Sequence, residues 1–401
     1  MRVLHVLDAA AARPTDYARR TRALLAELRA QGVQTVHLAG PECGAGVGLA
    51  AAGAAQPAAD GWPHHAWHLY RTTVPGPRAR RCAWLPPRWQ DAMGTAALGL
   101  RLRQVAALTR PDLIHVLAPS AYAAAAWPVA RLGRLPLVVD ADRRAAYGHG
   151  APSLARFGCA RADALAAPTL EMRAALRANG VRPRRIAIVP PAADVVPVPR
   201  TDPAPPGLVD APLLAFAGEP DAGGGIELLL DVLCALQRRH RALRLVVAGG
   251  GERTAWLDGR IAAAGLGGYV RVTGSLPGRR AADVLALADV AVFPALPGSA
   301  ALAPSRHLLN AMARGCAIVA SDIACHRELL VHGHSAMLFA AGSGMSLVDV
   351  LAQLLGDTAR LHALGQAAAH AVAATHNWTA TAAGYRRLYA AVLADARVRA
   401  R

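Results

Sequence analysis

The sequence contains no lysine: all 44 of its basic residues are arginine, against 27 acidic residues, and the formal net charge is +17. Charged residues make up only 18% of the chain and aromatic residues 4%, whereas hydrophobic residues make up 54%. A chain so apolar and so weakly charged is not expected to be intrinsically disordered. With 401 residues it is too long for one ordinary hydrophobic core, and we therefore expect two domains.

Cysteine is also scarce, and the six residues present form no CxxC pair and no spacing typical of metal ligands: Cys43, Cys82, Cys159, Cys234, Cys316 and Cys325. Buried free thiols in a reducing compartment are therefore favoured over a disulfide framework. Long apolar runs are absent as well. The N-terminal stretch reaches Asp8 too soon for a signal peptide, and the weakly charged stretch 285–304 holds Asp289 and three prolines, which argues against a membrane span. These absences predict a cytoplasmic protein.

The positive charge is concentrated in the first half of the chain. Residues 1–200 contain 26 arginines and 12 acidic residues, a balance of +14, whereas residues 201–401 have a balance of +3. GC-rich codon usage explains the choice of arginine over lysine, but not this asymmetry. A basic half favours an anionic partner, either membrane headgroups or a phosphate-linked acceptor, and the stretch from Arg71 to Trp89 mixes arginine with two tryptophans as interfacial loops do. No nucleic-acid-binding motif accompanies the charge, so a nucleic-acid partner is not expected.

Short apolar runs alternate with helical patterns along the whole chain. In the first half the runs cover residues 2–8, 34–40, 112–119, 135–142, 162–169 and 186–194, and helical periods cover 17–29 and 93–108. Near-continuous apolar strands separated by helices predict a parallel sheet covered on both faces. The alternation stops at a proline-rich stretch, residues 196–207, and then restarts. We therefore predict an α/β protein with two Rossmann-like, doubly wound domains facing a central cleft, residues 1–195 and 208–375, joined by that linker.

Three strand ends in the second half are rich in glycine: FAGEPDAGGG, AGGGER and VTGS. In parallel α/β sheets, ligands bind at the carboxyl ends of the strands, where glycine lets the backbone approach closely and helix N-termini offer N–H groups to phosphate. A simple strand-to-helix turn explains each segment alone equally well. Three such ends in one domain favour a nucleotide, and the candidate binding residues are Gly218, Gly249, Gly250, Glu252 and Gly274.

The second half resembles the nucleotide-sugar domain of the retaining GT-B glycosyltransferases of family 4. The resemblance rests on an ordered series of motifs: LAFAGE, LRLVVAGGGE, VRVTGSLP, ADVAVFPA, LLNAMARGCAIVASDIACHRELLVHGHSAMLF and NWTATAAGYRRLY. In the first half, MRVLHVLD, HLYRTT and RPDLIHVLAPS resemble the exosortase-associated (PEP-CTERM) branch of exopolysaccharide clusters. The resemblance implies the GT-B fold and a final helix, residues 376–401, that crosses back to the N-terminal domain.

The chain departs from this family at a pair of glutamates eight positions apart. The resemblance aligns Asn310 with the glutamate that usually binds the ribose hydroxyls, and Leu302 with the one that contacts the donor sugar. An amide can still hydrogen-bond a diol, but as a neutral group. The basic residue that commonly follows the first glycine loop is missing too. Arg306, just inside the helix opened by Pro304 and Ser305, is the candidate replacement, although a solvated helix start explains it equally well.

Two aspartates of the first half are the candidate catalytic residues. Asp140 and Asp142 end the apolar run 135–142, where the resemblance implies an acid or a histidine that positions the acceptor. A carboxylate there could assist deprotonation of the acceptor hydroxyl. The structural alternative is that Asp140 caps the next helix and that Asp142 pairs with a neighbouring arginine. His37 and His115 lie inside apolar runs and are interpreted as core or edge histidines with satisfied hydrogen bonds.

As the resemblance implies, we predict a glycosyltransferase that moves a sugar from a UDP- or GDP-type donor to an acceptor hydroxyl with retention, in exopolysaccharide or other glycan biosynthesis. We expect no cofactor and no metal, because His332 and His334 lack a third ligand. The acceptor is expected to be anionic or lipid-linked, at the inner-membrane surface. Because the two glutamates are replaced, a catalytically impaired binding or scaffold protein is the alternative, ahead of a nucleotide-sugar 2-epimerase.

Overall fold

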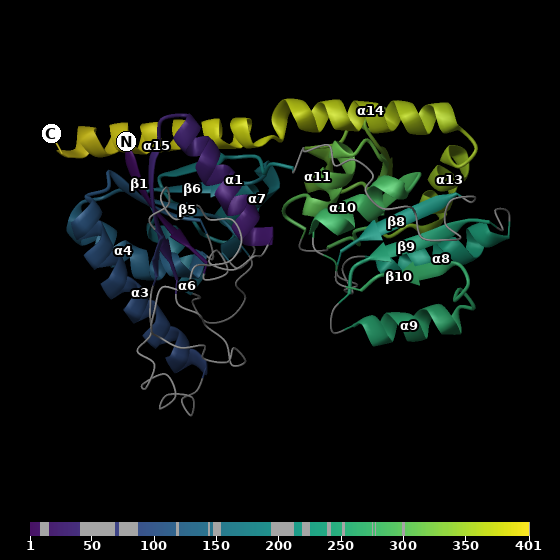
Figure 1. Cartoon of the computed structure of the whole chain (residues 1–401), viewed down its shortest axis with the longest axis horizontal. Helices are drawn as coiled ribbons and strands as arrows, with labels where there is room; N and C mark the ends of the chain where they lie inside the picture. Colours follow the sequence, from purple (N-terminus) through teal and green to yellow (C-terminus); the bar gives the residue numbers. More distant parts are fainter. Residues whose placement is uncertain are drawn as a thin grey trace. The chain divides into compact units, whose positions relative to one another are not determined.

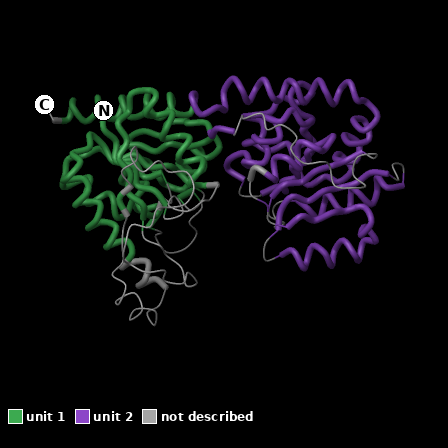
Figure 2. The backbone as a smooth tube through the Cα atoms, in the orientation of Figure 1, with its two compact units in different colours: residues 1–190, 381–401 green, residues 191–380 purple. Residues whose placement is uncertain are grey.

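The computed structural model describes residues 1–8, 16–40, 69–71, 87–117, 120–142, 145–146, 154–193, 212–218, 225–238, 242–250, 253–274, 276, 278–298 and 301–400. The proline-rich linker 196–207, Glu252 and most of the stretch 71–89 lie outside these residues. The chain divides into two compact units, residues 1–190 with 381–401 and residues 191–380 (Figure 2). The C-terminal residues therefore belong to the same unit as the N-terminal half.

Unit 1 is built on a sheet of seven described strands, all parallel, in the order β3-β2-β1-β4-β5-β6-β7. The strands are β1 (Arg2–Leu7), β2 (Gln34–Ala39), β3 (Leu69–Arg71), β4 (Leu113–Val116), β5 (Leu137–Asp140), β6 (Ala164–Ala167) and β7 (Arg185–Ile188). The chain builds outward from β1 to β3 and then returns to the other side of β1 with β4. This reversal creates a switch point between β1 and β4, which is where doubly wound sheets bind ligands.

The described helices of unit 1 are α1 (Asp16–Ala30), α3 (Pro87–Thr109), α4 (Ala123–Gly133), α6 (Leu154–Arg161), α7 (Leu170–Ala178) and α15 (Trp378–Ala400), with a short 3-10 turn, η2 (Ser120–Tyr122). They surround the sheet in Figure 1. The N-cap of α7 is Thr169, whose hydroxyl oxygen accepts a hydrogen bond from the N–H of Met172 at 3.0 Å.

The C-terminal helix α15 is attached to unit 1 by both apolar and polar contacts. Leu388, Tyr389 and Val392 of this helix are buried. At its far end Arg399 forms an ion pair with Asp163 at 2.9 Å, on the surface of unit 1. Exposed ion pairs contribute little to stability, so the buried face fixes the helix on this unit.

Unit 2 repeats the same plan with six described strands, all parallel, in the order β10-β9-β8-β11-β12-β13. The strands are β8 (Leu213–Ala217), β9 (Arg244–Ala248), β10 (Val270–Val272), β11 (Val290–Phe293), β12 (Ala317–Ser321) and β13 (Met337–Phe339). The helices are α8 (Ile226–Gln237), α9 (Thr254–Ala263), α10 (Gly278–Leu287), α11 (Arg306–Ala313), α12 (Ala324–Arg327), α13 (Gly344–Leu354) and α14 (Thr358–Thr375). The switch point of this sheet lies between β8 and β11.

Successive side chains of the unit 2 strands point to opposite faces of the sheet. Leu214 and Phe216 pack in one core cluster with α8, α9 and α13, whereas Ala215 and Ala217 pack in a second cluster with α10 and α11. Both faces are covered by helices (Figure 1). This burial on both sides explains why the strands read as near-continuous apolar runs instead of alternating ones.

The predicted architecture of two Rossmann-like, doubly wound units is confirmed. The runs predicted at 34–40 and 112–119 form β2 and β4, with ends that differ by up to three residues. The helix predicted at 93–108 begins earlier, at Pro87. Among the described residues, no helix is both long and apolar enough to cross a lipid bilayer.

Candidate functional site

The candidate nucleotide-binding glycines of unit 2 lie at one edge of its sheet. Gly218 follows β8, Gly249 and Gly250 follow β9, and Gly274 comes shortly after β10. These three strands are parallel neighbours, so their carboxyl ends share the same edge. Glu252, which the sequence groups with them, is not among the described residues. The sheet therefore brings the four described glycines to the edge where ligands bind in this architecture.

Close backbone approach explains two glycines of this region. A Cβ atom on Gly249 would lie 1.8 Å from the carbonyl oxygen of Gly218, the residue after the neighbouring strand. Gly225, the N-cap of α8, has a φ of 65°, and a Cβ atom there would lie 1.8 Å from the carbonyl oxygen of Pro294. Since Pro294 directly follows β11, the N-terminus of α8 packs against the switch point. N–H groups of a first helical turn at this position can bind an anion.

The other donor-side candidates lie on α11, the helix that follows β11. Ser305 is its N-cap, and the Ser305 hydroxyl oxygen accepts a hydrogen bond from the N–H of Leu308 at 3.1 Å. Arg306, in the first turn, is exposed, whereas Asn310, one turn later, is 8% exposed. Leu302, before the helix, is 2% exposed. The predicted helix start at Ser305 is confirmed, and the roles of these residues in donor binding stay predictions.

The short helix α12 carries His326 and Arg327. Nδ1 of His326 lies 2.8 Å from the carbonyl oxygen of Ser321, and burial lowers the pKa of this histidine. Arg327 forms an ion pair with Asp322. These contacts join the helix to the end of its own strand, β12, and give the segment a structural role.

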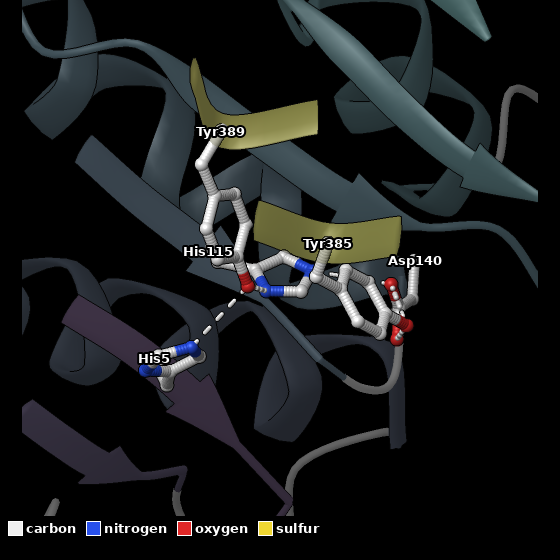
Figure 3. A network of polar contacts seen from close by, with 5 residues as sticks. All are labelled: His5, His115, Asp140, Tyr385 and Tyr389. Carbon is white, nitrogen blue, oxygen red and sulfur yellow. Dashed lines mark hydrogen bonds and ion pairs between the residues drawn. The ribbon is translucent and has the colours of Figure 1, made fainter. Parts of the chain in front are cut away.

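A network of polar side chains joins three strands of unit 1 to α15 (Figure 3). His5 comes from β1, His115 from β4, Asp140 from the end of β5, and Tyr385 and Tyr389 from the helix. The Tyr385 hydroxyl donates to both carboxylate oxygens of Asp140, at 2.9 and 3.0 Å. Nε2 of His115 lies 3.1 Å from Oδ1 of Asp140, and Nδ1 lies 2.7 Å from the Tyr389 hydroxyl. The Tyr389 hydroxyl is also 3.4 Å from Nε2 of His5.

Strand register extends this network into a row of three histidines. His5 is paired with His37 of β2 on one side and with His115 of β4 on the other. The ring centroids are 6.0 and 5.6 Å apart, and all three residues are fully buried. Burial lowers the pKa of His5 well below its ordinary value, and the two neighbouring histidines lower it further. His5 is therefore neutral at neutral pH.

The chemistry of the groups fixes the direction of the hydrogen bonds. Burial raises the pKa values of Tyr385 and Tyr389 well above 10, so both hydroxyls keep their protons. A carboxylate accepts hydrogen bonds, so the Nε2–H of His115 donates to Asp140. Nδ1 of the His115 ring accepts from the Tyr389 hydroxyl, which keeps its proton. The result is a chain of donors that all point toward the carboxylate.

The structure separates the two aspartates that the sequence groups together. Asp142 accepts a hydrogen bond from the N–H of Ala145 at 3.0 Å, whereas the Asp140 carboxylate contacts Tyr385 and His115. The capping interpretation of Asp140 stays a prediction, because residues 143–144 lie outside the described residues. The arginines expected to pair with Asp142 lie outside the described residues. The side chain of Asp140 is 25% exposed at the carboxyl edge of the sheet. Its catalytic role stays a prediction.

Sequence reasoning missed Tyr385 and Tyr389. Their spacing of four residues in GYRRLY puts both side chains on one face of a helix. This spacing could have identified them as a pair that acts together. The core interpretation of His37 and His115 is confirmed by their full burial. In the part of the chain that the structure describes, no three His, Cys, Asp or Glu side chains are grouped to hold a metal ion.

Two doubly wound units, each with candidate ligand-binding residues at the carboxyl edge of its sheet, define a two-domain α/β protein of Rossmann-like architecture. A family model described as glycosyl transferases group 1 matches residues 211–357, and one described as glycosyl transferase 4-like domain matches residues 17–192. Each half of the chain therefore matches a glycosyltransferase family, and the two-unit fold is the one found in GT-B glycosyltransferases.

Individual proteins agree with this assignment. The D-inositol 3-phosphate glycosyltransferase of Nocardia farcinica is 32% identical over 248 residues, which are 58% of this chain and 54% of that protein. The chain thus spans about half the length of this curated relative. Sucrose-phosphate synthase from Thermosynechococcus elongatus has the same fold over 98% of this chain and 100% of its own, with a TM-score of 0.74 and 16% identity. HepE of Anabaena, solved with UDP-glucose, gives a TM-score of 0.69 at 15% identity, covering 98% of this chain and 100% of HepE.

Proposed function

We propose that this chain transfers a sugar from a nucleoside-diphosphate donor to an acceptor hydroxyl with retention of configuration. The observation that carries the proposal is the common sheet edge of Gly218, Gly249 and Gly274, in the unit matched by the group 1 model. The helix α11 belongs to the same unit and follows β11, the strand that neighbours β8. HepE, which has the same fold, was solved with UDP-glucose. A UDP-sugar is therefore the first donor to test, and a GDP-sugar the second.

In this proposal the donor is held mainly by backbone groups of unit 2. The glycine-rich strand ends and the N-terminus of α11 bind the diphosphate, and Arg306 neutralises the charge that develops on it as it leaves. Asn310, in the second turn of α11, hydrogen-bonds the ribose. We assign no step to a metal, because an exposed guanidinium and helix N–H groups can stabilise the leaving diphosphate.

The acceptor is proposed to be anionic or lipid-linked and to bind unit 1, with Asp140 at its hydroxyl. The balance of +14 in residues 1–200 supports an anionic group. The name of the Nocardia relative points in the same direction, because D-inositol 3-phosphate is a phosphorylated polyol. A role in exopolysaccharide synthesis, in the exosortase-associated branch and at the cytoplasmic face of the inner membrane, is the finer form of this proposal.

The test is a turnover assay with a panel of UDP- and GDP-sugars and D-inositol 3-phosphate as the anionic acceptor probe. We expect release of nucleoside diphosphate and a product whose anomeric configuration, read by NMR, equals that of the donor. An inverted product would refute retention. A rate that falls on addition of a chelator and returns with metal would refute metal independence.

A binding or scaffold role without turnover is the second candidate. It is favoured by Leu302, an apolar buried residue that cannot contact a sugar hydroxyl through a side-chain hydrogen bond, and by the neutral amide of Asn310. Donor binding without detectable transfer or hydrolysis, across the whole panel, would support this second candidate over the first.

A further inference from the structure

We propose that Tyr385 is a positioning residue that orients the Asp140 carboxylate toward the acceptor hydroxyl. The inference rests on the proposed function, since it requires an acceptor bound at unit 1. It assigns to the C-terminal helix a part in the acceptor side of the reaction, in addition to its packing on the sheet.

Asp140 occupies a place where a substrate can reach it. It ends β5, which pairs with β4, one of the two strands at the switch point of unit 1. Ligands of doubly wound sheets bind outside the carboxyl ends of the strands at this point. One quarter of the Asp140 side chain is exposed (25%), whereas the His115 side chain that contacts it is fully buried. The carboxylate is thus accessible on one side and held by protein groups on the other.

His115 and Tyr385, the two donors to the Asp140 carboxylate, differ in how many of its oxygens they contact. The terminal torsion of an aspartate side chain is soft, so a single contact leaves the carboxylate plane free to rotate. His115 contacts one oxygen, Oδ1, whereas the Tyr385 hydroxyl lies within hydrogen-bond distance of both oxygens. Tyr385 is 7% exposed, so water has little access to replace its hydroxyl. The Tyr385 hydroxyl therefore holds the end of the carboxylate through both oxygens, and the His115 contact at Oδ1 sets its rotation. Lone pairs of Oδ2 stay available to an acceptor hydroxyl.

Tyr389 provides a matched comparison. It lies one turn later on the same helix and is fully buried, but its hydroxyl contacts His115 and His5 instead of Asp140. Tyr385→Phe and Tyr389→Phe each remove one buried hydroxyl from α15. A purely structural role predicts similar effects of the two substitutions, whereas positioning predicts a larger kinetic effect of Tyr385→Phe.

The experiment measures kcat and the acceptor KM with D-inositol 3-phosphate, the donor Kd by calorimetry, and Tm, for the wild type and these variants. We expect Tyr385→Phe to lower kcat by about ten- to a hundredfold, because small misplacements of a reacting group are costly. Its donor Kd should equal that of the wild type, since the donor binds unit 2. Tyr389→Phe should lower Tm by a similar amount and kcat by less than about threefold.

Asp140→Asn, alone and combined with Tyr385→Phe, tests whether the tyrosine acts through the carboxylate. If it does, Tyr385→Phe causes no further loss of kcat in the Asp140→Asn background. Additive losses, or equal kcat losses in the two tyrosine variants that follow Tm, would overturn the proposal. The wild type is assayed first: a wild type that transfers no sugar refutes the proposed function and this inference with it, whereas an active wild type matched by Tyr385→Phe refutes this inference alone.

Discussion

At the scale of single residues, His5 occupies a site that disfavours its charged form. It is surrounded by His37 on β2, His115 on β4 and Tyr389 on α15, all of them buried. A proton added to this row would be placed beside two further imidazoles without water. Burial, followed by these two histidines, accordingly lowers its pKa well below 6.5. The unfolded chain therefore binds a proton at His5 more readily than the folded chain does.

The sign of the resulting pH dependence follows directly. The stabilising contribution of a neutral His5 is complete above the unfolded pKa of 6.5 and is lost as the pH falls below it. Below that pH the slope is at most about 1.4 kcal/mol per pH unit, the value for one proton. His5→Gln should make the unfolding free energy, measured with urea, less dependent on pH below 6.5 than that of the wild type. His334→Gln, at an exposed position, is the control, and equal slopes for wild type and His5→Gln would disprove the prediction.

Asn310 tests the ribose contact. A neutral hydrogen bond contributes about 1 kcal/mol and a charged one about 1.5–3 kcal/mol, so Asn310→Glu should tighten donor binding by between a few-fold and about thirtyfold. Because Asn310 is 8% exposed, the new carboxylate should also lower Tm of the free protein.

Arg306→Ala should weaken donor binding if its guanidinium contacts the diphosphate. Calorimetry on the three proteins checks this, and unchanged affinities would remove both residues from the donor site.

At the scale of elements, the most demanding contact is the one between the ends of β8 and β9. Gly249→Ala forces a Cβ atom to within 1.8 Å of the Gly218 carbonyl oxygen, so the strand ends must separate. Overpacking of this kind costs about 1–3 kcal/mol, and donor affinity should fall with it. Gly259→Ala in α9 is the opposite case: nothing lies within 4 Å of the added Cβ, and replacing glycine in a helix should stabilise by up to about 1 kcal/mol. Thermal unfolding compares them, and a neutral Gly249→Ala would contradict the contact.

Most elements were predictable because their determinants are local. Buried parallel strands such as β8 and β12 appear as continuous apolar runs in the sequence. The start of α11 is predictable because serine, here Ser305, is a preferred N-cap residue. The strand β3 has only three residues, too few for a recognisable pattern. The contact between Tyr385 and Asp140 joins positions 245 residues apart and depends on the docking of α15 against β5. No local pattern contains that information, which is why the sequence named Asp140 but not the groups that hold it.

At the scale of the whole molecule, the fold does not explain why residues 1–200 have a charge balance of +14 and residues 201–401 a balance of only +3. The helix α3 of unit 1 exposes Leu100 and Leu108, at 67% and 73%, together with the exposed Arg103. Apolar and basic side chains exposed together are typical of surfaces that bind anionic membranes. The described part of this helix therefore agrees with the hypothesis drawn from the basic half of the sequence.

Liposome co-sedimentation tests this hypothesis. Binding should increase with the fraction of anionic lipid and decrease with salt, because exposed charges are screened beyond about 8–10 Å. The double variant Leu100→Ser and Leu108→Ser should bind more weakly than the wild type at equal charge. Equal binding to neutral vesicles, or none to anionic ones, would leave codon usage and an anionic soluble acceptor as sufficient explanations of the arginine content.

The central claim is that unit 2 binds a nucleoside-diphosphate sugar at the carboxyl edge of its sheet. Calorimetric titration of the wild-type chain with UDP, UDP-glucose and a panel of other nucleotide sugars tests it most directly, since it needs no acceptor and no turnover. We predict saturable binding of at least one of them with a Kd below about 1 mM. The absence of binding of every nucleotide and nucleotide sugar at millimolar concentration, by a chain whose thermal unfolding shows it to be folded, would contradict the claim.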